Sequence, residues 1–196
     1  MAGPDVGFSC RCGALQGVAH DVSPRSVNHL KCYCRDCQAA ARHLGDLDSL
    51  DAHGATDLFQ TVPSRIEITS GQEHLACLRL SPKGILRWYA GCCNSPLFTM
   101  LASRGVAFCG VNLARCGAEA QDIVGPVTGI YGADGARDMP EDFRNRGILP
   151  ATLKIIGRSL KARVTGDPNP FFDAGGAPIV APRILTLEER RAATPN

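Results

Sequence analysis

The segment that decides the fold class runs from Asp57 to Leu113 and contains six short apolar stretches. They read DLFQTV (57–62), SRIEITSG (64–71), HLACLRLS (74–81), GILRWYAG (84–91), SPLFTML (95–101) and VAFCGVNL (106–113). Each stretch alternates in part between apolar and polar residues, and Gly, Pro or Ser separates it from the next. The pattern predicts an antiparallel meander of five or six strands.

The composition is that of a globular chain. Of its 196 residues, 44% are hydrophobic and 20% charged, which suffices for one core and excludes a disordered protein. The net charge of +2 creates no strong field, so we expect no nucleic-acid partner. No apolar run approaches the roughly 18 residues of a membrane span, and the start MAGPDVGFSC does not resemble a signal peptide. We therefore expect a cytoplasmic protein without a membrane span.

Other elements are expected on both sides of the strand segment. Residues 8–20 predict a hairpin-like segment, and residues 27–34 predict a strand that leads into a helix over 36–44. Beyond Gly125 the pattern is less regular until Pro150, where a second helix is expected to begin and to end before Gly166. The tail from Asp167, rich in Pro and Gly, predicts an extended arm.

The strongest anomaly is the number and clustering of cysteines. The chain has ten, and the two densest units are Cys10-Arg11-Cys12 and Cys32-Tyr33-Cys34-Arg35-Asp36-Cys37. In a reducing cytosol such units favour metal ligation over disulfides, and short C-x-C and C-x-x-C loops suit tetrahedral zinc. Buried thiols that act as small apolar side chains are the alternative, which we prefer for Cys77, Cys109 and Cys116.

These units and a third element resemble the family of glutathione-dependent formaldehyde-activating enzymes, which includes centromere protein V. The family pattern has C-x-C-G, then C-x-C-x-D-C, then an aromatic strand end followed by C-x-x-C-G-S-P. The matching residues are Cys10, Cys12 and Gly13; Cys32, Cys34, Asp36 and Cys37; and Tyr89, Cys93, Ser95, Pro96 and Leu97. The resemblance covers roughly residues 7–115 and implies a mainly β, Mss4-like fold of antiparallel sheets with zinc sites.

The resemblance also implies one or two zinc ions per chain. Cys10 and Cys12 would join cysteines of the third element at a structural zinc, whereas Cys32, Cys34 and Cys37 would hold a catalytic zinc with an open position. Ala90 and Asn94 depart from the family pattern in the third element. Cys92 beside Cys93 is one candidate for the missing ligand, and a water or a remote residue is the other.

Three thiolates leave zinc a poor activator of water but a good binder of a fourth thiol. A bound thiol, held as thiolate, attacks a carbonyl carbon, and the reverse reaction is a carbon–sulfur lyase step. The resemblance implies glutathione as the thiol, an aldehyde as its partner, and an enzyme of the S-(hydroxymethyl)glutathione synthase type. The sequence neighbours Arg11, Lys31, Arg35 and Arg42 are candidates for compensating the sulfur charge. A non-catalytic, zinc-stabilised binding module remains the alternative.

The C-terminal part carries a basic amphipathic helix. Residues 144–163 contain six Lys and Arg and no acid. Leu153, Ile156, Leu160 and Val164 fall on one side of this helix, opposite its basic residues: Lys154, Arg158 and Lys161. We expect the apolar side to pack on the sheet, with contact to a partner or an anionic surface as the alternative. In sum, residues 1–125 are predicted to form the zinc-binding β domain, and 126–196 an extension packed on it.

Overall fold

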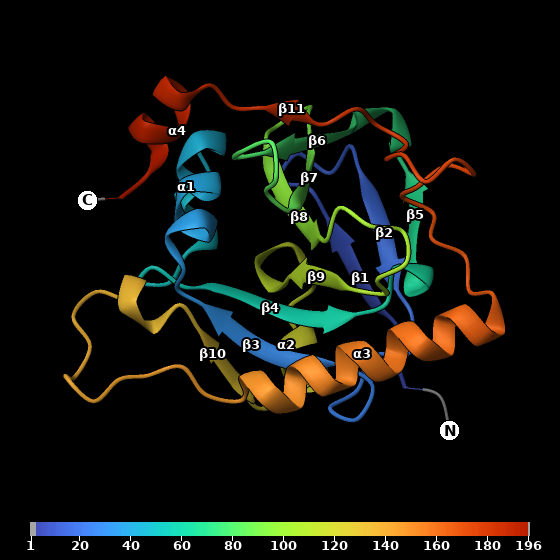
Figure 1. Ribbon diagram of the computed structural model, residues 1–196, viewed down its shortest axis with the longest axis horizontal. Helices are drawn as coiled ribbons and strands as arrows, with labels where there is room; N and C mark the ends of the chain where they lie inside the picture. The colour runs from blue at the N-terminus through green and yellow to red at the C-terminus, as the bar shows by residue number, and fades with distance from the viewer. Residues whose placement is uncertain (1–2, 196) are drawn as a thin grey trace.

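Two β-sheets form the body of the chain in the computed structural model, which describes residues 3–195 (Figure 1). The small sheet has the order β1-β2-β5, and the large sheet has the order β10-β3-β4-β9-β8-β7-β6-β11. The strands are β1 Val6–Ser9, β2 Gln16–Ala19, β3 Asn28–Cys32, β4 Thr56–Thr61, β5 Ile66–Ser70, β6 Leu75–Arg79, β7 Leu86–Ala90, β8 Ser95–Met100, β9 Cys109–Asn112, β10 Gly129–Tyr131 and β11 Arg183–Ile184. Apart from the edge strands β10 and β11, which pair in parallel, the ladders are antiparallel.

The strand segment 57–113 forms six strands, but they do not make one continuous meander. Strands β6 to β9 follow one another in the large sheet, whereas β5 leaves it and pairs with β2. Strand β4 is buried on both faces at Leu58 and Phe59, so it takes a central place between β3 and β9. In β5 only Ile66 is buried and Glu67 is exposed, which suits the small sheet. The mainly β fold class is confirmed.

The main core lies between the sheets and is completed by the C-terminal tail. Trp88 is fully buried, and its ring centre lies 5.2 Å from that of Phe171. Phe98 contacts Phe8 edge-on at 5.0 Å and Phe171 at 5.6 Å. Burial of one aromatic side chain stabilises the fold by about 2–3 kcal/mol, so the region around Phe171 is an integral part of the core. Residues 1 and 196, the outer bounds of the two predicted domains, lie outside the described residues.

Four α-helices flank the sheets: α1 Arg35–Leu44, α2 Ala120–Val124, α3 Ile148–Thr165 and α4 Leu187–Ala193. Helix α1 confirms the expected helix after the cysteine motif; Gly45, at φ 67°, closes it. Helix α4 packs beside α1 (Figure 1), where an extended arm was expected. Its start carries a capping box between Thr186 and Glu189, which explains why a helix forms there.

Helix α3 confirms the expected C-terminal helix but packs with the opposite side from the one we predicted. Leu153, Ile156, Leu160 and Val164 face solvent, with exposed fractions of 57% to 81%. The guanidinium of Arg158 instead turns inward and donates to the carbonyl oxygens of Gln60 (3.1 Å) and Ser26 (2.6 Å).

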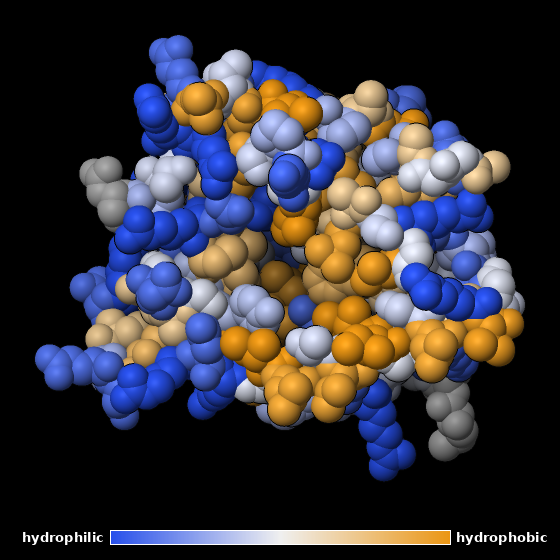
Figure 2. All heavy atoms as spheres, viewed as in Figure 1, coloured by the Kyte–Doolittle hydropathy of each residue, from blue (hydrophilic) through white to orange (hydrophobic). Residues whose placement is uncertain are grey.

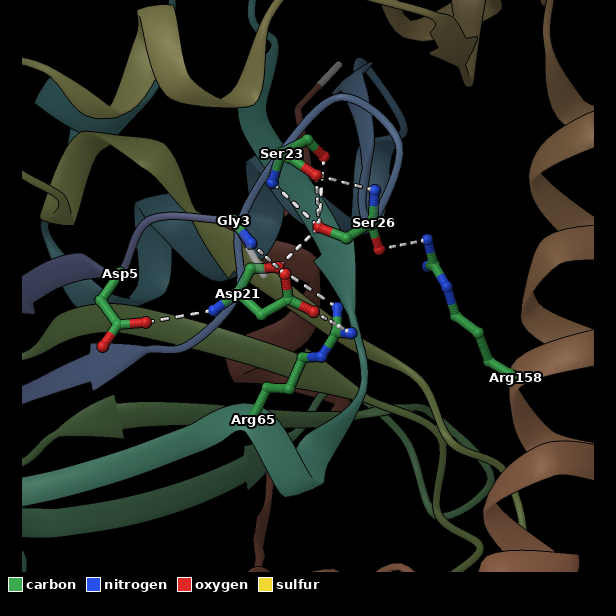
Figure 3. A network of polar contacts seen from close by, with 7 residues as sticks. All are labelled: Gly3, Asp5, Asp21, Ser23, Ser26, Arg65 and Arg158. Carbon is green, nitrogen blue, oxygen red and sulfur yellow. Dashed lines mark hydrogen bonds and ion pairs between the residues drawn. The ribbon is translucent and has the colours of Figure 1, made fainter. Parts of the chain in front are cut away.

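The polar surface beneath α3 accounts for this orientation. Ser26 belongs to a network in which its hydroxyl donates to the Asp21 carbonyl (2.6 Å), while Arg65 pairs with the Asp21 carboxylate (Figure 3). The Ser159 hydroxyl on α3 accepts from the amide of Ala107 at 3.0 Å. Backbone groups at this surface require polar partners, which the apolar side of α3 does not offer. Within residues 3–195, no helix combines the length and the hydropathy needed to cross a bilayer.

Candidate metal centres

Four cysteines from two distant turns meet at one end of the sheets. The Sγ atoms of Cys10, Cys12, Cys92 and Cys93 all lie within 4.8 Å of one another, and all four thiols are free. The Sγ–Sγ distances are 3.5 Å for Cys10–Cys12, 3.4 Å for Cys12–Cys92, and 3.8 Å for both Cys10–Cys92 and Cys92–Cys93. A tetrahedral zinc with sulfur at about 2.3 Å has edges of about 3.8 Å. The four-cysteine group therefore fits such an ion.

The two turns that hold this group have identifiable backbone causes. Gly13, at φ 77°, turns the β1–β2 connection so that the amide of Leu15 donates to Sγ of Cys10 at 3.3 Å. Asn94 adopts a left-handed φ of 54°, which turns the chain back into β8 after the two adjacent cysteines. Ala90 is a buried strand residue in β7. Cys92, which follows β7 in the turn, contributes a fourth sulfur to the group.

Ser95 and Arg11 hold the two turns together. The Ser95 hydroxyl accepts from the amide of Arg11 at 2.9 Å and lies 3.2 Å from Sγ of Cys93. The Arg11 guanidinium donates to the carbonyl of Cys93 at 2.6 Å. Although burial opposes ionisation, hydrogen bonds from Ser95 and Cys12 lower the pKa of the Cys93 thiol to about 6. A thiol that ionises readily is a suitable metal ligand.

Three further cysteines meet where β3 passes into α1. Cys32 ends β3, Cys34 caps the helix start and Cys37 lies in its first turn. Their Sγ atoms lie within 4.8 Å of one another, with 3.3 Å between those of Cys32 and Cys34. The amide of Cys37 donates to the carbonyl of Cys34 at 3.0 Å. This hydrogen bond closes a turn that brings the two side chains to the same side of the chain. This three-cysteine group offers one sulfur fewer than a closed tetrahedral site.

A buried arginine that the sequence analysis did not single out faces the three-cysteine group. Nη1 of Arg87, on β7, lies 3.7 Å from Sγ of Cys37, and the residue is only 6% exposed. Hydrogen bonds from Cys32 and Cys34 outweigh burial and, with the charge of Arg87, hold the pKa of Cys37 well below the usual thiol value. The available signal was a charged residue between Leu86 and Trp88 in an otherwise apolar strand.

Within residues 3–195, none of the four cations expected beside this group forms a hydrogen bond with its sulfur atoms. Lys31 pairs with Asp51 at 2.9 Å, and Arg11 lies at the four-cysteine group, 3.3 Å from Asp46. Arg35 and Arg42 are exposed on α1. Charge compensation for the three sulfurs thus comes from β7, a strand 50 residues away along the chain.

The three-cysteine group forms part of the wall of an open pocket of about 420 Å³. In Figure 2 the molecule is hollowed in the middle of the displayed face, between apolar side chains. The pocket's apolar residues are Leu30, Leu58, Ile85, Leu101, Phe108 and Ile155. Its other residues that bear on chemistry are Cys32, Cys34, Cys37, Asp36, Lys83, Arg87, Thr99 and Tyr131. The site therefore offers three thiols and two cationic side chains next to a largely apolar cavity.

Comparisons with known proteins assign no activity to this site. Residues 3–182 match the model of a family described as a family of unknown function, DUF6151. No curated protein matches the chain. A crystal structure of a Rhodobacter sphaeroides protein is similar at 17% identity with a TM-score of 0.43, over 64% of this chain and 98% of that one.

Proposed function

Because the chain belongs to the DUF6151 family of unknown function, we propose its function from the site: a zinc-dependent, carbon–sulfur lyase-like enzyme that acts on thiol–aldehyde adducts of the glutathione type. One observation carries the proposal. The four-cysteine group offers a complete tetrahedral set, whereas the three-cysteine group offers one ligand fewer and lines an open pocket. This difference supports a structural role for the first group and substrate binding for the second.

The donor set favours zinc at both groups. Thiolates select soft or borderline ions, and zinc is the ion that tetrahedral sulfur sites most often hold in a redox-neutral role. When bound to Cys32, Cys34 and Cys37, zinc would supply a Lewis acid that stabilises the deprotonated form of an incoming thiol. The buried Arg87 supplies positive charge beside Cys37, so that a sulfur-rich centre is not left uncompensated in a desolvated place.

The proposed reaction is redox-neutral and needs no further reactant. In the synthetic direction the thiol loses its proton, sulfur bonds to the aldehyde carbon, and the carbonyl oxygen gains a proton and becomes a hydroxyl. The lyase direction reverses each step. The apolar wall formed by Leu58, Phe108 and Ile155 excludes water from the reacting carbon. Lys83 lines the pocket, and its ammonium group would bind a substrate carboxylate there.

The motif resemblance to the glutathione-dependent formaldehyde-activating enzymes supports the same chemistry. On the basis of this resemblance we propose the substrates as well. Glutathione, or a thiol of similar charge, is the expected ligand, and a small aldehyde is the second reactant. The cytoplasm, where glutathione is abundant, is the expected location. The rival function is a zinc-stabilised binding module without turnover, which predicts a three-cysteine centre that does not respond to thiols.

Cobalt substitution distinguishes these functions. The holoprotein is loaded with Co²⁺, and its sulfur-to-metal charge-transfer band is recorded while glutathione is added. We expect glutathione to shift the band, Cys34→Ala to abolish the shift, and Cys116→Ala to preserve it, because Cys116 belongs to neither group. A spectrum of closed four-thiolate centres that ignores millimolar glutathione would favour the binding module.

Turnover is tested separately by nuclear magnetic resonance of the adduct formed from glutathione and formaldehyde. The holoprotein is expected to accelerate exchange between adduct and free thiol, and Cys34→Ala to remove that acceleration. Lys83→Gln should raise KM with little effect on kcat, since Lys83 is assigned to binding rather than to bond making. Glutathione binding without any acceleration would contradict the enzyme and leave a thiol-binding protein.

A further inference from the structure

Helix α3 presents a continuous apolar stripe to solvent. Its members, Leu149, Leu153, Ile156, Leu160 and Val164, are 57% to 81% exposed. Successive helix residues are about 100° apart, which places all five within an arc of about 80°. Figure 2 shows the stripe as an apolar band along the lower edge of the displayed face, where Figure 1 places α3. Large apolar side chains rarely gather in this way on a surface that stays in water.

The stripe is a fixed feature because the other side of α3 is anchored. Arg158 donates to the backbone carbonyl of Ser26 (Figure 3) and to that of Gln60, and Ser159 accepts from the amide of Ala107. Ala151 is buried on the same side. Rotation of α3 to bury its leucines would break these hydrogen bonds and leave the carbonyls of Gln60 and Ser26 without the Arg158 donor. The protein therefore holds the stripe outward.

Every charged residue of α3 itself is basic. Residues 143–166 contain no Asp or Glu. Lys154 and Lys161 flank the stripe on one side and Arg163 flanks it on the other, and these three are exposed. Among residues 3–195, none places a carboxylate within ion-pair distance of these cations. Two copies that met stripe to stripe would bring these like charges together, so charge complementarity points to an anionic occupant.

We propose that α3 docks the protein on an anionic phospholipid bilayer. The apolar stripe enters the boundary between headgroups and acyl chains, while Lys154, Lys161 and Arg163 extend to lipid phosphates and carboxylates. The helix lies parallel to the membrane plane because Ala151, Arg158 and Ser159 hold its opposite side against the protein. Docking through α3 requires neither cysteine group.

The test is cosedimentation of the full-length, metal-loaded protein with vesicles. One set contains phosphatidylcholine alone, and the other an equimolar mixture of phosphatidylcholine and phosphatidylserine. We expect binding to the anionic vesicles only, weakened by added salt. The double variant Leu153→Gln/Leu160→Gln should bind them at least about tenfold more weakly, because it removes apolar area from the centre of the stripe. Leu47→Gln, which alters a similarly exposed leucine outside α3, should bind like the wild type.

Two controls separate docking from misfolding and from self-association. Trp88 is the single tryptophan and is fully buried, so an unchanged emission spectrum verifies the fold of the variants. Light scattering of the free protein reports its oligomeric state. Binding that is absent, equal for neutral and anionic vesicles, or unaltered in the double variant would overturn the proposal. The proposal would also be overturned if the free protein were a dimer that the Leu153→Gln/Leu160→Gln variant dissociates and that Leu47→Gln leaves intact.

Discussion

Arg87 and Cys37 form a buried contact, with 3.7 Å between Nη1 of the guanidinium and Sγ of the thiol. They come from different layers of the molecule: Arg87 from the middle of β7 and Cys37 from the first turn of α1. The contact places one positive charge beside three sulfurs that would otherwise repel one another when ionised. It is also the clearest structural difference between the three-cysteine group and a simple metal-binding loop.

Arg87→Leu is expected to lower the unfolding free energy of the metal-loaded protein by about 3–5 kcal/mol, because it leaves a buried thiolate uncompensated. Arg87→Lys should recover part of this loss, since it keeps a positive charge at this position but lacks the planar guanidinium. Urea denaturation followed by Trp88 emission measures both variants. Equal stability of Arg87→Leu and the wild type would mean that the charge at this position is dispensable.

Cys12→Ser should remove metal from the four-cysteine group. Sγ of Cys12 lies within 3.5 Å of two partner sulfurs, so its loss breaks the tetrahedral set. Elemental analysis is expected to find one metal equivalent fewer per chain and denaturation to find a loss on the order of 3 kcal/mol or more. The cobalt response to glutathione should persist in the folded fraction. The matched control Cys116→Ser should keep its full metal content and most of its stability.

The buried imidazole of His29 predicts a pH-dependent stability. Burial lowers its pKa, but hydrogen bonds to Asp57 (2.7 Å) and to the carbonyl of Gly125 (2.5 Å) outweigh burial, so the pKa is raised above its usual 6.5. A raised pKa means that the folded state binds the proton more tightly than the unfolded state. The stabilisation is therefore complete below the unfolded pKa of about 6.5 and is lost as the pH rises through the folded value.

The measurement is urea denaturation of the wild type and of His29→Gln over a series of pH values from acid to mildly alkaline. The wild type should be more stable than the variant by about 1–3 kcal/mol at the acidic end, and the difference should narrow as the pH rises. The comparison cancels the titration of the cysteines, which both proteins share. A difference that widens with pH would show that His29 folds in its neutral form.

Phe171→Ala tests whether the C-terminal tail is part of the core. Removing a ring that contacts Trp88 and Phe98 should cost about 3–5 kcal/mol. The emission of Trp88 should also shift to longer wavelength as water reaches the site. Leu187→Ala, at a side chain that is 72% exposed, should cost less than about 0.5 kcal/mol. Equal effects of the two substitutions would mean that the tail does not stay docked in solution.

Local patterns predicted most of the strands and both cysteine units, because strand alternation and ligand spacing are short-range properties. Contacts between distant segments were not predictable in the same way. Nothing near Cys37 in the sequence points to Arg87. The meeting of Cys10 with Cys92 and Cys93 was expected from the family resemblance alone, because no local pattern states how two distant turns lie in space. The prediction for the orientation of α3 was wrong. A helical pattern separates an apolar side from a basic side but does not state which side packs on the rest of the protein.

The distribution of the sulfurs along the chain also bears on how the protein is made. Cys32, Cys34 and Cys37 leave the ribosome together, so this group can capture metal as soon as β3 and α1 are synthesised. Cys10 must wait for Cys92, which is 82 positions later, and the core is not closed until Phe171 has emerged. During that interval the early thiols of Cys10 and Cys12 are open to oxidation and to competing metals. Supply of the correct ion during biosynthesis is therefore expected to limit the yield of correctly assembled protein in cells.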